Sequence, residues 1–125
     1  MDTREYIKAA ISSIDELGKL LDKEGIKYEL HRKYSSEEQI EEYLLVNQIR
    51  VWKYPDSEDE QLKHLFYSAI CHFGYYGFHQ GLIEVYDFNH EPIGHCVPQE
   101  AFSILIDWFY DLREQERLRG ELNDF

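Results

Sequence analysis

Two cysteine–histidine pairs are the side chains in this sequence best suited to metal binding or nucleophilic chemistry. Cys71 precedes His72, and His95 precedes Cys96. Two cysteines and two histidines can hold zinc, and a cysteine with a histidine base can act as a nucleophile. Adjacent residues point about 100° apart on a helix and to opposite faces on a strand, so neither pair can readily grip one ion. We therefore expect two reduced, partly buried thiols, no metal and no cofactor.

Motifs that carry enzyme chemistry are absent from the chain. The phosphate-binding patterns GxxxxGK[ST] and GxGxxG are missing, and so are HExxH, GxSxG and CxxC. This favours a protein that is not an enzyme. An unfamiliar catalyst stays open as an alternative, with His79, His95, Cys96 or a carboxylate as its acid–base group. Two of these groups converging in one deep pocket would support it.

The segment from residue 73 to 81, FGYYGFHQG, combines three glycines with four aromatic side chains: Tyr75, Tyr76, Phe78 and His79 lie between the glycines. Glycine permits tight backbone geometry, and tyrosine offers rigid contact area with a polar tip. Two interpretations stay open: the rings close one end of the core, or they form an exposed binding surface. In the second case we expect Tyr75, Tyr76 and His79 to be exposed.

The formal net charge of −12 is the strongest feature of the composition. Half of the excess lies in residues 35–62, which carry eight acidic and two basic side chains. A field of this sign disfavours direct binding to nucleic acid or to anionic membranes and favours a basic partner. The alternative is that the charge only keeps the protein dispersed, as a solvated helix face and as helix N-terminal capping. The candidate partner-binding carboxylates are Glu37, Glu38, Glu41, Glu42, Asp56, Glu58, Asp59 and Glu60.

Hydrophobic periodicity predicts one domain, residues 1–125, of α+β class, with three to four helices packed on a small antiparallel sheet. Capping-box patterns and apolar spacing predict helices from Asp2 to Gly25, from Ser35 through Leu44, from Ser57 to Phe73 and from Pro98 to Gly120. Alternating residues predict strands at 26–31, 48–54 and 82–88, the last returning through a turn at 89–92 into a strand at 93–97.

The last predicted helix is apolar around much of its circumference, with Ile104, Leu105, Ile106, Trp108 and Phe109 in one run. Such a helix is buried on two sides, within the fold or by a second subunit, so a homodimer is one expectation. No segment has the length of a membrane span and the N-terminus has no signal-peptide pattern, so we expect a cytoplasmic protein.

These observations favour a non-catalytic protein that inhibits or neutralises a basic, nucleic-acid-handling partner such as a nuclease, in the manner of immunity or anti-defence proteins. The carboxylates would occupy the partner's phosphate-binding groove, and the 73–81 segment would anchor it. The alternative is a protein that binds or sequesters a small nucleotide-like ligand, with a site at a homodimer interface. In that case Tyr75, Tyr76 and Phe78 would stack on a base, and Arg113 or Arg117 would meet its charge.

Overall fold

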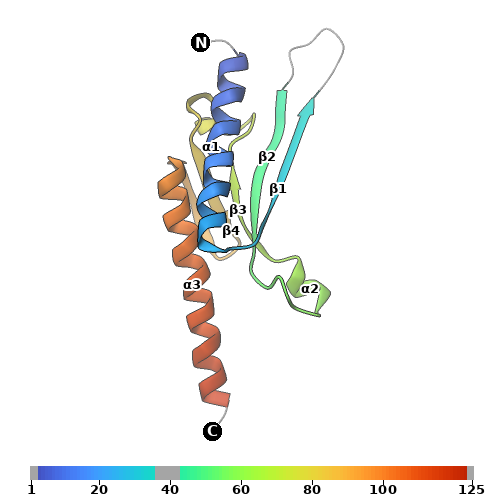
Figure 1. The fold of residues 1–125 in the computed structure, drawn as a ribbon, viewed down its shortest axis with the longest axis vertical. Coiled ribbons are helices and arrows are strands. Elements are labelled where there is room, and N and C mark those ends of the chain that lie inside the picture. Colours follow the sequence, from blue (N-terminus) through green and yellow to red (C-terminus); the bar gives the residue numbers. More distant parts are fainter. Residues whose placement is uncertain (1–2, 36–42, 124–125) are drawn as a thin grey trace.

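The computed structural model describes residues 3–35 and 43–123, and it is an α+β fold in which two long helices pack on one face of an antiparallel sheet (Figure 1). The sheet is a meander in which each strand pairs with the next one along the chain. Its strands are β1 (Tyr28–Ser35), β2 (Tyr43–Trp52), β3 (Phe66–Ile70), β4 (Ile83–Asp87) and β5 (His90–Cys96).

Helix α1 (Thr3–Glu24) forms as its apolar spacing predicts. Its buried stripe is Ala10, Ile14, Leu17 and Leu21, which recur every three or four residues and face the sheet. The helix ends at Gly25, whose φ of 74° lies in the left-handed region that favours glycine. The amide of Gly25 donates to Asp22 O at 3.1 Å and the next amide donates to Leu21 O at 3.1 Å, which is a Schellman motif.

Helix α3 (Pro98–Asn123) begins at the predicted proline and packs beside α1. Ala101, Leu105 and Trp108 are buried in its N-terminal half. Phe102, Ile104, Ile106 and Phe109 pack partly buried against the same core, so the apolar circumference of this half is accounted for within one chain. The C-terminal half extends past the end of the sheet (Figure 1), where Leu118 is exposed.

Two of the predicted helices are wrong. The helix expected from Ser57 to Phe73 is only the single turn α2 (Glu60–Lys63), followed by the strand β3. The helix expected through Tyr43 and Leu44 is strand β2 at those two residues, and its earlier part lies outside the described residues. The sheet consequently has one more strand than the four that the sequence predicts, and the described residues form two long helices in place of the four predicted ones, while the α+β class is confirmed.

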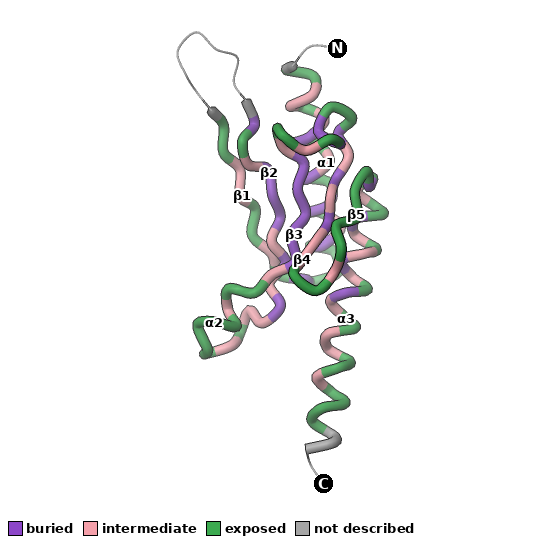
Figure 2. The backbone as a smooth tube through the Cα atoms, turned by 180° about the vertical axis from the view of Figure 1, so that it is seen from behind, coloured by how far each residue is buried: buried purple, intermediate pink, exposed green. Residues whose placement is uncertain are grey.

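The core lies between the helices and the near face of the sheet, because alternate residues of β2, β3 and β4 point to it: Ile49, Val51, Tyr67, Ala69, Ile83 and Val85. Asn47 is the polar exception and is fully buried. Its amide nitrogen donates to Ala10 O at 3.0 Å and to Cys71 O at 2.9 Å, which joins α1 to the end of the central strands. Neither long helix covers the other face of the sheet, which is turned to the viewer in Figure 2.

Candidate functional site

The connection between β2 and β3 carries half of the candidate partner-binding carboxylates, and all four are exposed: Asp56, Glu58, Asp59 and Glu60. Asp59 caps α2 through its side chain. Asp56 pairs with Lys27 at 3.1 Å and Glu60 pairs with Lys63 at 3.5 Å. Exposed pairs of this kind contribute about 0–1 kcal/mol. A partner's cations can therefore displace them at little cost.

Apolar side chains are exposed at the same end of the sheet. Leu62 and Leu65 are each 37% exposed, and Phe88, at the β4–β5 turn, is fully exposed. Leu65 and Phe88 line one hollow, so they are neighbours across the end of the sheet. We call residues 56–65 together with Phe88 the acidic end. The sequence does not predict this exposed apolar part, because Leu62 and Leu65 fall within the helix expected from Ser57 to Phe73 and Phe88 falls within the strand expected at 82–88.

The 73–81 segment joins β3 to β4 and contains a short 3-10 helix, η1 (Tyr76–Gln80). Tyr76 is 90% exposed and His79 is exposed, whereas Phe78 is buried in the core. Tyr75 is half-buried, and its hydroxyl accepts a hydrogen bond from the amide of His95 at 2.7 Å. Phe78 therefore closes the core, whereas Tyr76 and His79 face solvent and Tyr75, which was expected to be exposed, does so only in part.

The acidic end and the 73–81 segment do not form one surface. They are successive connections of a meander, and successive connections lie at opposite ends of the strands. Figure 1 shows α2 at one end of the sheet and the yellow 3-10 turn at the other. The remaining candidate carboxylates, at positions 37, 38, 41 and 42, lie outside the described residues.

Arg113 and Arg117 lie on α3, where Arg113 donates to the carbonyl oxygen of Lys53 next to the end of β2. Tyr75 and Tyr76 lie on the β3–β4 connection, at the opposite end of the strands. The structure does not bring these tyrosines and arginines together within one chain, so the nucleotide-like site would need a second copy. Arg117 binds Glu114 at 2.6 Å.

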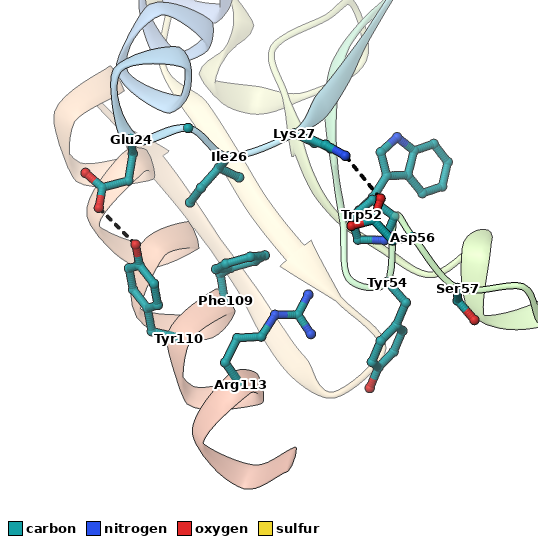
Figure 3. A pocket seen from close by; sticks show the side chains of 12 residues that line it. Glu24, Ile26, Lys27, Trp52, Tyr54, Asp56, Ser57, Phe109, Tyr110 and Arg113 are labelled. Atoms are coloured by element: carbon teal, nitrogen blue, oxygen red, sulfur yellow. Dashed lines mark hydrogen bonds and ion pairs between the residues drawn. The ribbon is translucent and has the colours of Figure 1, made fainter. Parts of the chain in front are cut away.

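A hollow of about 530 Å³ lies beside Arg113, between α3, the end of α1 and the β2–β3 connection (Figure 3). The Arg113 guanidinium lies 4.7 Å from the Phe109 ring centroid and 5.6 Å from that of Tyr54. It also pairs with Glu116 at 2.9 Å and donates to the carbonyl oxygen of Lys53. The charge of Arg113 is therefore already paired within the chain.

The other charged groups of this hollow and the Tyr110 hydroxyl are paired as well. The Tyr110 hydroxyl donates to Glu24 at 2.9 Å, and Lys27 binds Asp56 on the opposite wall. The bond to Glu24 raises the pKa of Tyr110. A charged ligand would have to break these contacts, so the hollow is not arranged to receive one.

The two cysteines are free and buried. Burial raises the pKa of Cys71 to about 12 and also raises the pKa of Cys96. Both are therefore neutral thiols near neutral pH, which disfavours them as nucleophiles. Within residues 3–35 and 43–123, no group of three histidine, cysteine or acidic side chains could hold a metal ion.

The long helices in the described part of the chain are too polar to span a bilayer, and no membrane-crossing helix is found there. No protein-family model, curated protein or solved structure matches the sequence or the fold.

Proposed function

We propose that this protein is a non-catalytic binding protein whose acidic end docks on a basic partner protein of the kind that handles nucleic acid, and thereby blocks it. The observation that carries the proposal is the pairing of four exposed carboxylates with a fully exposed aromatic ring, Phe88, at one end of the sheet.

The combination suits an interface with a cationic groove. Carboxylates steer a basic surface toward the protein, and the attraction acts before contact. Apolar and aromatic side chains then supply the desolvated centre of the interface. In this proposal Phe88 and Leu65 are the anchors, in place of Tyr75 and His79, because only the former lie beside the described carboxylates.

The test compares two purified variants of equal net charge. Glu58→Lys/Glu60→Lys reverses two carboxylates of the acidic end. Glu5→Lys/Glu16→Lys reverses two exposed carboxylates of α1. Wild type and both variants are immobilised and used to capture proteins from the native host. A protein retained by wild type and by the α1 variant, and lost by the acidic-end variant, is then purified.

Association of the purified partner is measured by stopped flow from low to physiological salt. We expect the association rate for wild type to fall as salt rises, and the partner's nuclease or nucleic-acid-binding activity to be inhibited. The proposal is wrong if both charge variants lose the partner equally, or if association is insensitive to salt. Phe88→Ala should weaken the same complex through faster dissociation.

A further inference from the structure

The uncovered face of the sheet contains a cleft of about 420 Å³ that belongs to neither helix layer. Cross-strand register places Arg50, Ser68 and Tyr86 side by side in one row. The next row toward the acidic end pairs Trp52 with Phe66, and Phe88 stands at the rim. Figure 2 looks onto this face, with β2, β3 and β4 side by side.

A buried polar chain forms the floor of the cleft. The Arg50 Nε donates to Gln48 Oε1 at 3.0 Å, and Gln48 Nε2 donates to Ser68 Oγ at 2.6 Å. Gln48 is 9% exposed and Ser68 is 1% exposed. An arginine side chain can only donate, so Gln48 can bond to both Arg50 and Ser68 only with its amide oxygen toward Arg50 and its amide nitrogen toward Ser68. Ser68 accepts in this chain, and its own proton stays available for another acceptor.

Arg50 differs from the comparable basic side chains that the structure describes. Arg32, Lys53, Lys63 and Arg113 are also not exposed, and each of them makes an ion pair with a carboxylate. Arg50 makes no such pair with a described residue. Its direct cross-strand neighbour Glu29 binds His31 at 3.0 Å instead. Among the residues that the structure describes, the terminal nitrogens of this guanidinium therefore have no carboxylate partner.

The Phe66 ring and the Gln48 side chain fix the position of the Arg50 guanidinium. Its carbon lies 4.8 Å from the centroid of the Phe66 ring, and its Nε is tied to Gln48. Such a stacked guanidinium presents its two terminal nitrogens as a fork, which matches two oxygens of a carboxylate or phosphate. Among the residues that line the cleft, Asp87 and Lys53 cancel, and Arg50 adds one positive charge.

Aromatic rings surround the fork. Phe66 and Tyr86 line the cleft, and Phe88 offers a fully exposed ring at its rim. A flat apolar body lying against these rings would bury them, while its anionic group bound the terminal nitrogens of Arg50.

We propose that this cleft binds a small aromatic acid, a molecule with one flat ring and one carboxylate or phosphate group, with Arg50 as the anion-binding residue. The site does not depend on the proposed function, since a basic partner would be recognised by the acidic end. Both an aromatic carboxylate and a mononucleotide have this chemistry, and the test separates them.

The test is two-dimensional NMR titration with pairs of probes at millimolar concentration. Benzoate is compared with benzamide, which lacks the charge. Phenyl phosphate is compared with inorganic phosphate, which lacks the ring, and AMP is the nucleotide arm. We expect saturable shifts in β2, β3 and β4 with benzoate, phenyl phosphate or AMP, and binding at least about tenfold weaker for benzamide and inorganic phosphate.

Three variants assign the binding to the cleft. Arg50→Gln should weaken it by about ten- to a hundredfold, whereas Lys33→Gln, which removes an exposed cation of β1, should leave it unchanged. Phe88→Ala should also weaken probe binding. Because the Phe88 ring is fully exposed, its removal should leave the fold intact, so this variant still tests the cleft if Arg50→Gln fails to fold. No saturable binding of any probe, or equal binding by wild type and both cleft variants, overturns the proposal. Glu58→Lys/Glu60→Lys should retain probe binding. A failure of the partner proposal can therefore be told apart from a failure of this one.

Discussion

Replacing Asp87 by asparagine should destabilise this protein far more than the loss of one surface charge. The Asp87 side chain is completely buried, and its two oxygens accept from Lys53 at 2.6 Å and from His90 at 2.6 Å. Lys53 is 10% exposed at its side chain and lies 4.5 Å from the Tyr67 ring centroid. The substitution keeps the size of the side chain but leaves the Lys53 ammonium buried without a counter-ion.

The expected magnitude follows from the geometry. Two unit charges 2.6 Å apart attract by roughly 6 kcal/mol at an effective dielectric constant of about 20. Part of that is offset by the cost of desolvating the carboxylate, so we expect Asp87→Asn to lower the free energy of unfolding by about 3–5 kcal/mol. This is a large share of the about 5–15 kcal/mol typical of a whole domain.

Urea unfolding near neutral pH measures this difference, with Asp56→Asn as the control. Asp56 and Lys27 form an ion pair of the same type, but both side chains are exposed, so this change should cost less than about 1 kcal/mol. The double variant Lys53→Met/Asp87→Asn should recover part of the loss, because it no longer buries an unpaired charge. A loss below about 1 kcal/mol for Asp87→Asn would refute the reasoning.

The same pair gives a pH dependence with a defined sign. Burial alone would raise the pKa of Asp87, but hydrogen bonds from Lys53 and His90 outweigh it and hold the pKa below its ordinary value. The folded state therefore binds fewer protons at this carboxylate than the unfolded state does. Its contribution to stability is complete above the ordinary aspartate pKa of about 4 and is lost as the pH falls through the lower folded value. Asp87→Asn should lack this part of the acid sensitivity.

Two further predictions concern buried groups away from the acidic end. Burial raises the pKa of Cys71 to about 12. Its reaction with iodoacetamide at about pH 8, followed by mass spectrometry, should therefore be roughly a thousandfold slower in the folded protein than in urea. Comparable rates would contradict the assignment of Cys71 as a neutral, inaccessible thiol. Gly77→Ala should lower the free energy of unfolding by about 1–3 kcal/mol in the urea assay, because the added Cβ would overlap the Tyr75 ring. Gly120→Ala, where the Cβ meets nothing within 4 Å, should be neutral or slightly stabilising. Equal effects of the two substitutions would show that the Tyr75 ring moves aside without cost.

If both proposals hold, the protein has two overlapping recognition surfaces at the same end of the sheet. The acidic end attracts cations, and the cleft around Arg50 attracts one anion. They share Leu65 and Phe88, which line the cleft and also belong to the acidic end. A small ligand in the cleft would therefore cover apolar surface that the partner needs, and we expect the two to compete.

The amino-acid sequence determined the parts of this fold that depend on local pattern. Helix α1 with its glycine stop, helix α3 with its initial proline, and the β4–β5 hairpin follow from periodicity and end signals. The same reasoning failed for β3, because its neighbourhood, Leu62, Leu65, Phe66, Ala69 and Ile70, also fits helical spacing. A central strand is buried on both faces and loses the alternation that marks a strand, so a short apolar run fits either structure.

The acidic character of residues 35–62 was likewise plain from the sequence, but the position of residues 56–60 at the same end of the sheet as Phe88 was decided by the tertiary structure. Because the turn of α2 and strand β3 separate them, the acidic residues 56–60 and the aromatic 73–81 segment lie at opposite ends of the sheet. Arg50 was not singled out, because alternation in a strand says only which residues share a face. The Phe66 ring beside Arg50, and the lack of a carboxylate partner for Arg50 among the described residues, depend on the register of β1, β2 and β3, which sequence-distant residues set together.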